Sequence, residues 1–107
     1  MRKKYSEMSM AELQTEIGEL KVKAQKAEQQ GMINEFAVHE RKMLMAQAYL
    51  LDPKDFNGGE RYEFKDQPEE YFDIEYMNGV FAWGYRKEAE TLEAVPISVF
   101  GQRLPKK

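Results

Sequence analysis

Two hydrophobic periodicities divide the chain, a helical one in residues 1–53 and a strand-like one in residues 58–105. A capping-box pattern at Ser9–Glu12 predicts the start of a first helix, and Gly31 fits the residue that ends it. A second amphipathic run follows at once, with Asn34 as the expected N-cap and Asp52-Pro53 as the stop. The short connection predicts an antiparallel helical hairpin, whose small core should pack on the second half as one folding unit. The apolar stripe of the first helix contains Leu13, Ile17, Leu20, Ala24 and Ala27.

The segment Tyr71–Arg86 alternates between apolar and polar residues on both sides of Asn78-Gly79. Asn-Gly is typical of a two-residue type I′ turn, in which both residues have positive φ. This turn would place Ile74 opposite Trp83 and would leave Ala82 and Gly84, with Asp73 and Glu75, on the outer face. The core face would then consist of Phe72, Ile74, Tyr76, Phe81, Trp83 and Tyr85.

Shorter alternating segments flank this hairpin and predict further strands. Arg61–Lys65 should be a strand with Tyr62 and Phe64 inward, Asp66–Glu70 a loop, and Thr91–Val95 a strand that Pro96 interrupts. Residues 97–104 should hold a short 3-10 turn and a last strand. Five short strands joined by tight turns favour a small antiparallel barrel. The expected fold class is therefore α+β, an N-terminal helical hairpin followed by a small SH3-like five-stranded antiparallel β-barrel.

Composition restricts the function. The 107 residues are 42% hydrophobic and 33% charged, which is typical of a soluble globular protein. Cysteine is absent, which excludes disulfides, thiolate catalysis and cysteine-based zinc sites. Residues 52–107 carry 8 basic and 12 acidic side chains, so nucleic-acid binding would have to depend on local basic patches. A signal peptide and a long apolar run are not evident, so we expect a cytoplasmic protein without membrane contact.

Three stretches of the sequence resemble a bacterial family. They are KAEQQGMINEFAVHERKMLMAQAYLLDP, YMNGVFAWGYR and EAVPIS. These stretches are similar to the YfhH-like family of short bacterial proteins, and the resemblance extends over nearly the whole chain. It implies an SH3-like barrel with an N-terminal helical hairpin. Members are sometimes labelled transcriptional regulators, but the family offers no catalytic or ligand motif to transfer to this chain.

Candidate catalytic and metal-binding residues are few. His39 is the only histidine, and it flanks the apolar stripe of the second helix, so we interpret it as a surface or boundary residue. A metal site built from His39, Glu35 and Glu40 is disfavoured because Glu40 points elsewhere. Asp73 and Glu75 fit a solvated sheet face better than a cation site. We therefore expect no enzyme, no catalytic residue, no metal and no cofactor.

The candidate partner-binding residues are Tyr76, Trp83, Tyr85, Arg86 and Lys87. The three aromatic side chains each have a polar tip that favours a wet boundary. On an SH3-like barrel, exposed aromatic residues can dock an extended peptide or stack on bases. The sequence leaves open whether Trp83 closes the core or lies at its rim.

These observations predict a small regulatory or adaptor protein that binds a macromolecule, most consistently a protein. A nucleic-acid-binding regulator is the alternative. A homo-oligomer is also compatible with the sequence, and a small-molecule substrate is not evident.

Overall fold

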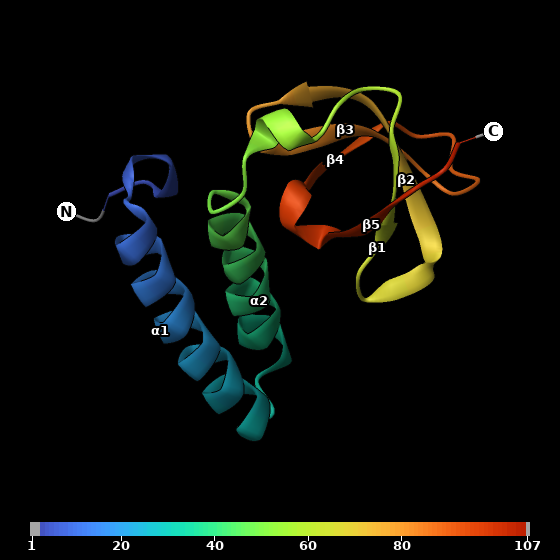
Figure 1. Ribbon diagram of the computed structural model, residues 1–107. Coiled ribbons are helices and arrows are strands. Elements are labelled where there is room, and N and C mark those ends of the chain that lie inside the picture. Colours follow the sequence, from blue (N-terminus) through green and yellow to red (C-terminus); the bar gives the residue numbers. More distant parts are fainter. Residues whose placement is uncertain (1–2, 107) are drawn as a thin grey trace. The chain divides into compact units, whose positions relative to one another are not determined.

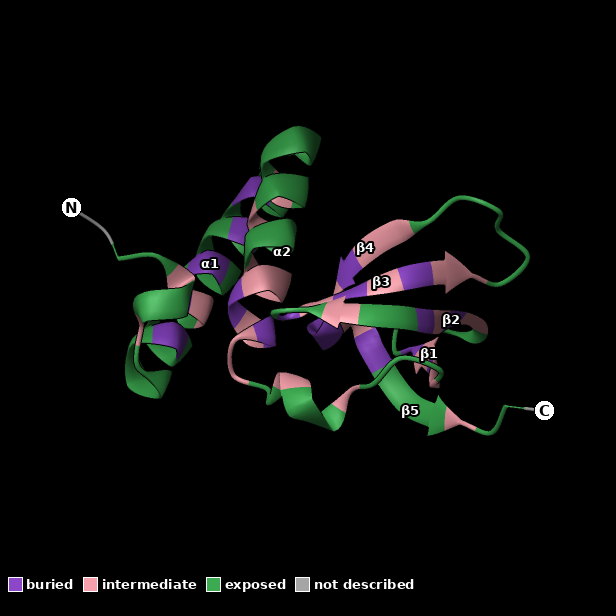
Figure 2. Ribbon diagram, turned by 90° about the horizontal axis from the view of Figure 1, so that it is seen from above, coloured by how far each residue is buried: buried purple, intermediate pink, exposed green. Residues whose placement is uncertain are grey.

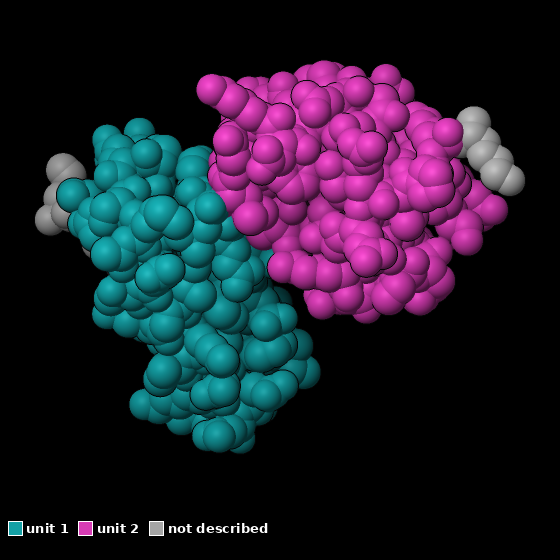
Figure 3. Space-filling view, viewed as in Figure 1, with its two compact units in different colours: residues 1–50 teal, residues 51–107 magenta. Residues whose placement is uncertain are grey.

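The computed structural model describes residues 3–106 and shows two helices followed by a five-stranded antiparallel sheet, an α+β arrangement (Figure 1). The chain divides into two compact units, residues 1–50 and 51–107 (Figure 3). The first unit contains the short 3-10 helix η1 (Tyr5–Glu7) and the helices α1 (Met10–Gln29) and α2 (Ile33–Ala48). The second contains η2 (Pro53–Asp55), all five strands and η3 (Ile97–Val99).

Helix α1 begins and ends where its local signals predict. The Ser9 hydroxyl accepts the Glu12 amide at 3.2 Å, and the Glu12 carboxylate accepts the Ser9 amide at 2.9 Å, which completes the capping box. Gly31 has a φ of +71° just after the helix, as a C-terminal glycine should. Four predicted stripe residues are buried, namely Leu13, Leu20, Ala24 and Ala27.

Helix α2 follows as the second arm of the predicted antiparallel hairpin and packs against α1 (Figure 1). It begins two residues earlier than predicted, with Met32 as the N-cap, so the prediction for Asn34 is wrong. It ends at Ala48, where the Tyr49 amide bonds to the Ala46 carbonyl at 3.2 Å. This i→i+3 bond tightens the last turn before the chain reaches Pro53.

The sheet has the strand order β4-β3-β2-β1-β5, and every neighbouring pair is antiparallel. Its strands are β1 (Arg61–Phe64), β2 (Gln67–Asn78), β3 (Phe81–Arg86), β4 (Glu93–Pro96) and β5 (Phe100–Leu104). The first strand and the final 3-10 turn with its strand are confirmed. The predicted loop at Asp66–Glu70 is wrong, because Phe64 pairs with Gln67 and β2 begins there. The fourth strand begins at Glu93, two positions later than predicted.

The five described strands form an open sheet. The edge strands are β4 and β5, and η3 joins them without a ladder between the two among the described residues. A barrel removes its edges only by pairing the first and last strands of the sheet. The predicted closed SH3-like barrel is therefore not confirmed.

One face of the sheet is an aromatic core. Phe72 is fully buried, and its ring centroid lies 6.1 Å from that of Phe64 and 5.6 Å from that of Phe100. Tyr62 stacks on Phe100 with centroids 5.1 Å apart. The inward placement of Tyr62 and Phe64 is thus confirmed, as is the core position of Phe72 and Ile74.

The central hairpin differs from its prediction by one residue. Gly79 has a φ of +60°, but Asn78 stays in β2 and pairs with Phe81, so the predicted type I′ turn is wrong. A bulge between Ile74 and Tyr76 then breaks the regular register. A shift of one residue moves every side chain of a strand to the opposite face.

As a result, the side of β3 that faces the core is the opposite of the predicted side. Ala82 and Gly84 are buried, and burial alternates along β3 in Figure 2. A Cβ atom on Gly84 would collide with the Asp73 carbonyl and would lie 3.0 Å from Cε1 of Phe72. Small residues are needed here because the Phe72 ring fills the space. The predicted core positions of Tyr76, Phe81, Trp83 and Tyr85 are therefore wrong.

Candidate functional site

Aromatic side chains gather on the face of the sheet that points away from the core. This outer aromatic face consists of Tyr71, Tyr76, Phe81, Trp83 and Tyr85. Tyr76 and Trp83 are cross-strand partners whose rings are nearly parallel, at 6°, with centroids 6.0 Å apart. Tyr76 is 47% exposed and Trp83 is half-buried. Trp83 therefore lies on the outer face against Tyr76 and does not close the core.

A charged pair lies beside these rings. Arg61 donates to Asp73 through Nε at 2.6 Å and through Nη2 at 3.0 Å, and each side chain is only about a quarter exposed. The guanidinium carbon also lies 3.9 Å from the centroid of the Tyr71 ring. Hydrogen bonding to Asp73 raises the pKa of Arg61 above its ordinary value. The Asp73 carboxylate is therefore engaged in an ion pair with Arg61 within the sheet.

The structure brings three of the five candidate residues together and separates the other two. Tyr76, Trp83 and Tyr85 share the outer aromatic face. Arg86 instead pairs with Phe72, its guanidinium lies 4.5 Å from the Phe64 ring centroid, and its Nε donates to Glu93 at 2.7 Å. Lys87 is exposed just beyond β3.

Sequence reasoning missed Tyr71 and Arg61 as members of this region. A signal for both residues existed, because Tyr71 and Asp73 occupy alternate positions of one strand and Arg61 lies opposite Asp73. Finding it required the register between β1 and β2, which the sequence pattern did not supply.

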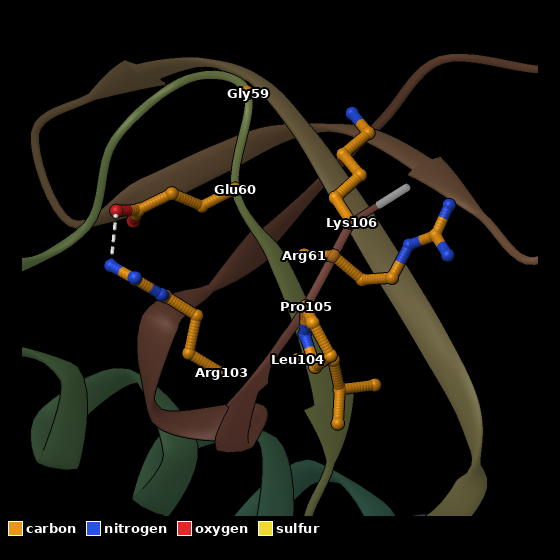
Figure 4. A pocket seen from close by; sticks show the side chains of 7 residues that line it. All are labelled: Gly59, Glu60, Arg61, Arg103, Leu104, Pro105 and Lys106. Atoms are coloured by element: carbon orange, nitrogen blue, oxygen red, sulfur yellow. Dashed lines mark hydrogen bonds and ion pairs between the residues drawn. The ribbon is translucent and has the colours of Figure 1, made fainter.

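A second feature of the sheet unit is a shallow depression of about 360 Å³. Figure 4 shows Glu60 and Arg103 on one side of it and Arg61 and Lys106 on the other. Arg103 donates to Glu60 at 3.0 Å, and Arg61 is occupied by Asp73. Both guanidinium groups are thus neutralised within the sheet unit, and Lys106 is the one lining cation without an ion pair among residues 3–106.

Glu60 is held by several donors. Its carboxylate accepts the Asn57 amide at 2.9 Å and the Tyr62 hydroxyl at 3.1 Å, besides the Arg103 guanidinium. Burial by itself would raise the pKa of Glu60, but these donors outweigh burial and lower the pKa below its ordinary value of 4.5. Glu60 therefore fixes the loop before β1 to the end of β5.

The helical unit contains few side chains that could catalyse a reaction or hold a metal ion. His39 is half-buried, as expected, and its Nδ1 has no hydrogen-bond partner among the described residues. Residues 3–106 contain no cluster of three or more histidine, aspartate or glutamate side chains that could hold a metal ion. No helix in this described range is long and apolar enough to cross a membrane.

The fold and this site define a class of small α+β proteins, in which a helical hairpin precedes an open antiparallel sheet with aromatic residues on its outer face. The chain belongs to the family described as "Protein of unknown function (DUF1811)", whose model matches residues 3–101. It is similar to the uncharacterized protein YfhH of Bacillus subtilis (strain 168), with 54% identity over 104 residues. That alignment covers 96% of this chain and 99% of the relative. The resemblance inferred from the sequence is thereby confirmed.

Proposed function

We propose that this chain is a small non-enzymatic adaptor or regulatory protein whose outer aromatic face binds an extended segment of another protein. The observation that carries the proposal is the stacked Tyr76–Trp83 pair on the outer face of the sheet. The core has its own aromatic cluster around Phe72, so the core does not account for this second one. Tyrosine and tryptophan are enriched at protein interfaces, where they supply rigid, partly polar contact area.

The strand arrangement supports an SH3-like form of the sheet. The order β4-β3-β2-β1-β5, with a 3-10 turn between β4 and β5, suits a partly open barrel of that kind. Modules of this type dock extended peptides in aromatic-lined grooves. The cytoplasmic location remains part of this proposal.

Binding of a nucleic acid is the second candidate, because bases also stack on aromatic side chains. The 12 acidic side chains of residues 52–107 outnumber the 8 basic ones, which opposes a phosphate backbone. Retention on heparin, duplex DNA and single-stranded DNA at several salt concentrations separates the two candidates. A nucleic-acid complex should form at low salt and weaken steeply as salt rises.

A display experiment tests the protein-binding proposal. A library of linear peptides is selected on the immobilised chain, and the selected peptides are then tested on Trp83→Ala and Ile33→Ala. Ile33 is 78% exposed and lies in the helical unit, so Ile33→Ala is a matched loss of exposed apolar surface. We expect binding to survive in Ile33→Ala and to disappear in Trp83→Ala while the circular dichroism of both variants stays native. Equal binding to both variants would refute the proposal.

A further inference from the structure

We propose that the segment bound by the outer aromatic face carries arginine, and that one arginine stacks on the Tyr76–Trp83 pair beside Glu75. This inference rests on the proposed function and specifies the chemistry of the partner. It starts from the way this face already holds a guanidinium. Arg61 stacks over the Tyr71 ring at 3.9 Å and forms two hydrogen bonds with Asp73, which lies two residues along β2 from Tyr71 on the same face.

The neighbouring part of the outer aromatic face also has aromatic rings and a carboxylate, but it has no cation in the described part of the chain. Tyr76 and Trp83 supply an aromatic surface, of which Tyr76 is 47% exposed. Glu75 is the inserted residue of the bulge, so Glu75 and Tyr76 together oppose Trp83. Glu75 is exposed and has no ion pair among residues 3–106. A ring and a free carboxylate thus lie next to each other at this position.

The charge of the central strand favours the same partner. Strand β2 carries four acidic side chains and no basic one, Glu69, Glu70, Asp73 and Glu75. Only Asp73 has an ion-pair partner among the described residues. At the outer aromatic face the unpaired carboxylate is that of Glu75, and its charge attracts cations and repels phosphate groups and acidic segments there.

Arginine suits the position better than lysine. Its planar guanidinium can stack on an aromatic ring while its edge donates two parallel hydrogen bonds to a carboxylate. The compact ammonium of lysine cannot do both, and it is more strongly hydrated. An extended segment with an arginine among small residues would place the guanidinium over Tyr76 and Trp83.

Trp83 also makes the proposal measurable, because it is the only tryptophan of the chain. Three synthetic glycine–serine peptides are titrated into the full chain, with arginine, neutral citrulline or glutamate at the same positions. The change in Trp83 fluorescence gives each affinity. We expect the arginine peptide to bind about tenfold more tightly than the citrulline peptide, and the glutamate peptide not to bind.

Two charge-matched variants locate the contact. Glu75→Gln removes the proposed carboxylate, and Glu28→Gln removes an exposed carboxylate at the end of α1. Glu75→Gln should weaken the arginine peptide by about three- to tenfold, and Glu28→Gln should leave it unchanged. Equal effects of the two variants would overturn the assignment of Glu75.

The outcomes separate this inference from the proposed function. If display-selected neutral peptides bind and are lost in Trp83→Ala, while arginine gives no advantage over citrulline, the arginine inference is wrong and the proposed function stands. If neither the selected peptides nor the arginine peptide changes Trp83 fluorescence, both are wrong. If an oligonucleotide changes it at low salt and the arginine peptide does not, the nucleic-acid alternative replaces both.

Discussion

Replacing Phe72 and Trp83 separately by alanine tests which face of the central hairpin forms the core. Phe72 is fully buried between the rings of Phe64 and Phe100. Truncating such a core phenylalanine removes its transfer free energy and leaves a cavity, which together cost about 3–5 kcal/mol. We therefore expect Phe72→Ala to lower the free energy of unfolding by that amount.

Trp83→Ala should lower the free energy of unfolding less than Phe72→Ala does. Trp83 is half-buried on the outer face, and its single described ring contact is the stack on Tyr76. An aromatic pair contributes about 0.5–1.5 kcal/mol beyond the area it buries. With the partial burial of the indole added, Trp83→Ala should lower the free energy of unfolding by about 1–2 kcal/mol.

Urea unfolding followed by far-ultraviolet circular dichroism compares the two variants, because Trp83→Ala removes the only tryptophan and with it the fluorescence signal. Leu92→Ala is the control, since Leu92 is 39% exposed and precedes β4, and its change should stay within about 0.5 kcal/mol. Unchanged m-values would show that all proteins expose similar surface on unfolding. If Trp83→Ala is as destabilising as Phe72→Ala, Trp83 belongs to the core and the observed register is wrong.

Two further substitutions probe the sheet. Gly84→Ala should destabilise the protein by about 1–3 kcal/mol because the new Cβ meets the Asp73 carbonyl. Gly18→Ala, where nothing lies within 4 Å, should instead stabilise α1, and similar urea midpoints for the two variants would contradict the close approach. The pKa of Glu60 is lower in the folded chain than in the unfolded one, so its contribution is present at neutral pH and is lost as the pH falls below about 4.5, through the folded pKa. Glu60→Gln should therefore lower the urea midpoint at pH 7 more than at pH 3, and an equal loss at both pH values would contradict this linkage.

Much of the local structure could be read from the sequence because its causes are local. The Ser9–Glu12 capping box and Gly31 bound the first helix through hydrogen bonds within a few residues. Strand alternation placed Tyr62, Phe64 and Phe72 in the core, since burial alternates residue by residue where each of them lies. The aromatic part of the candidate site was also recognised from the polar tips of Tyr76, Trp83 and Tyr85.

The positions of those aromatic residues depended on contacts between distant segments. Ile74 accepts the Gly59 amide at 2.7 Å and donates its own amide to the Glu60 carbonyl at 2.9 Å. A Cβ on Gly58 would lie 2.5 Å from the Glu75 carbonyl oxygen, so only glycine lets the loop approach β2 where the bulge forms. The sequence pattern of β2 and β3 contains no trace of this approach.

The sequence by itself thus determined the two helices, most strand positions and the inward placement of Tyr62, Phe64 and Phe72, because periodicity and capping act over a few neighbouring residues. Only the tertiary structure decided that Ala82 and Gly84 face the core, that Trp83 stacks on Tyr76 outside it, and that Arg86 lies on the other face. The physical reason is the period of two in a β-strand. Glu75 is a single inserted residue, and a loop some fifteen positions earlier stabilises the bulge that it forms. This insertion exchanges the two faces of the rest of the hairpin.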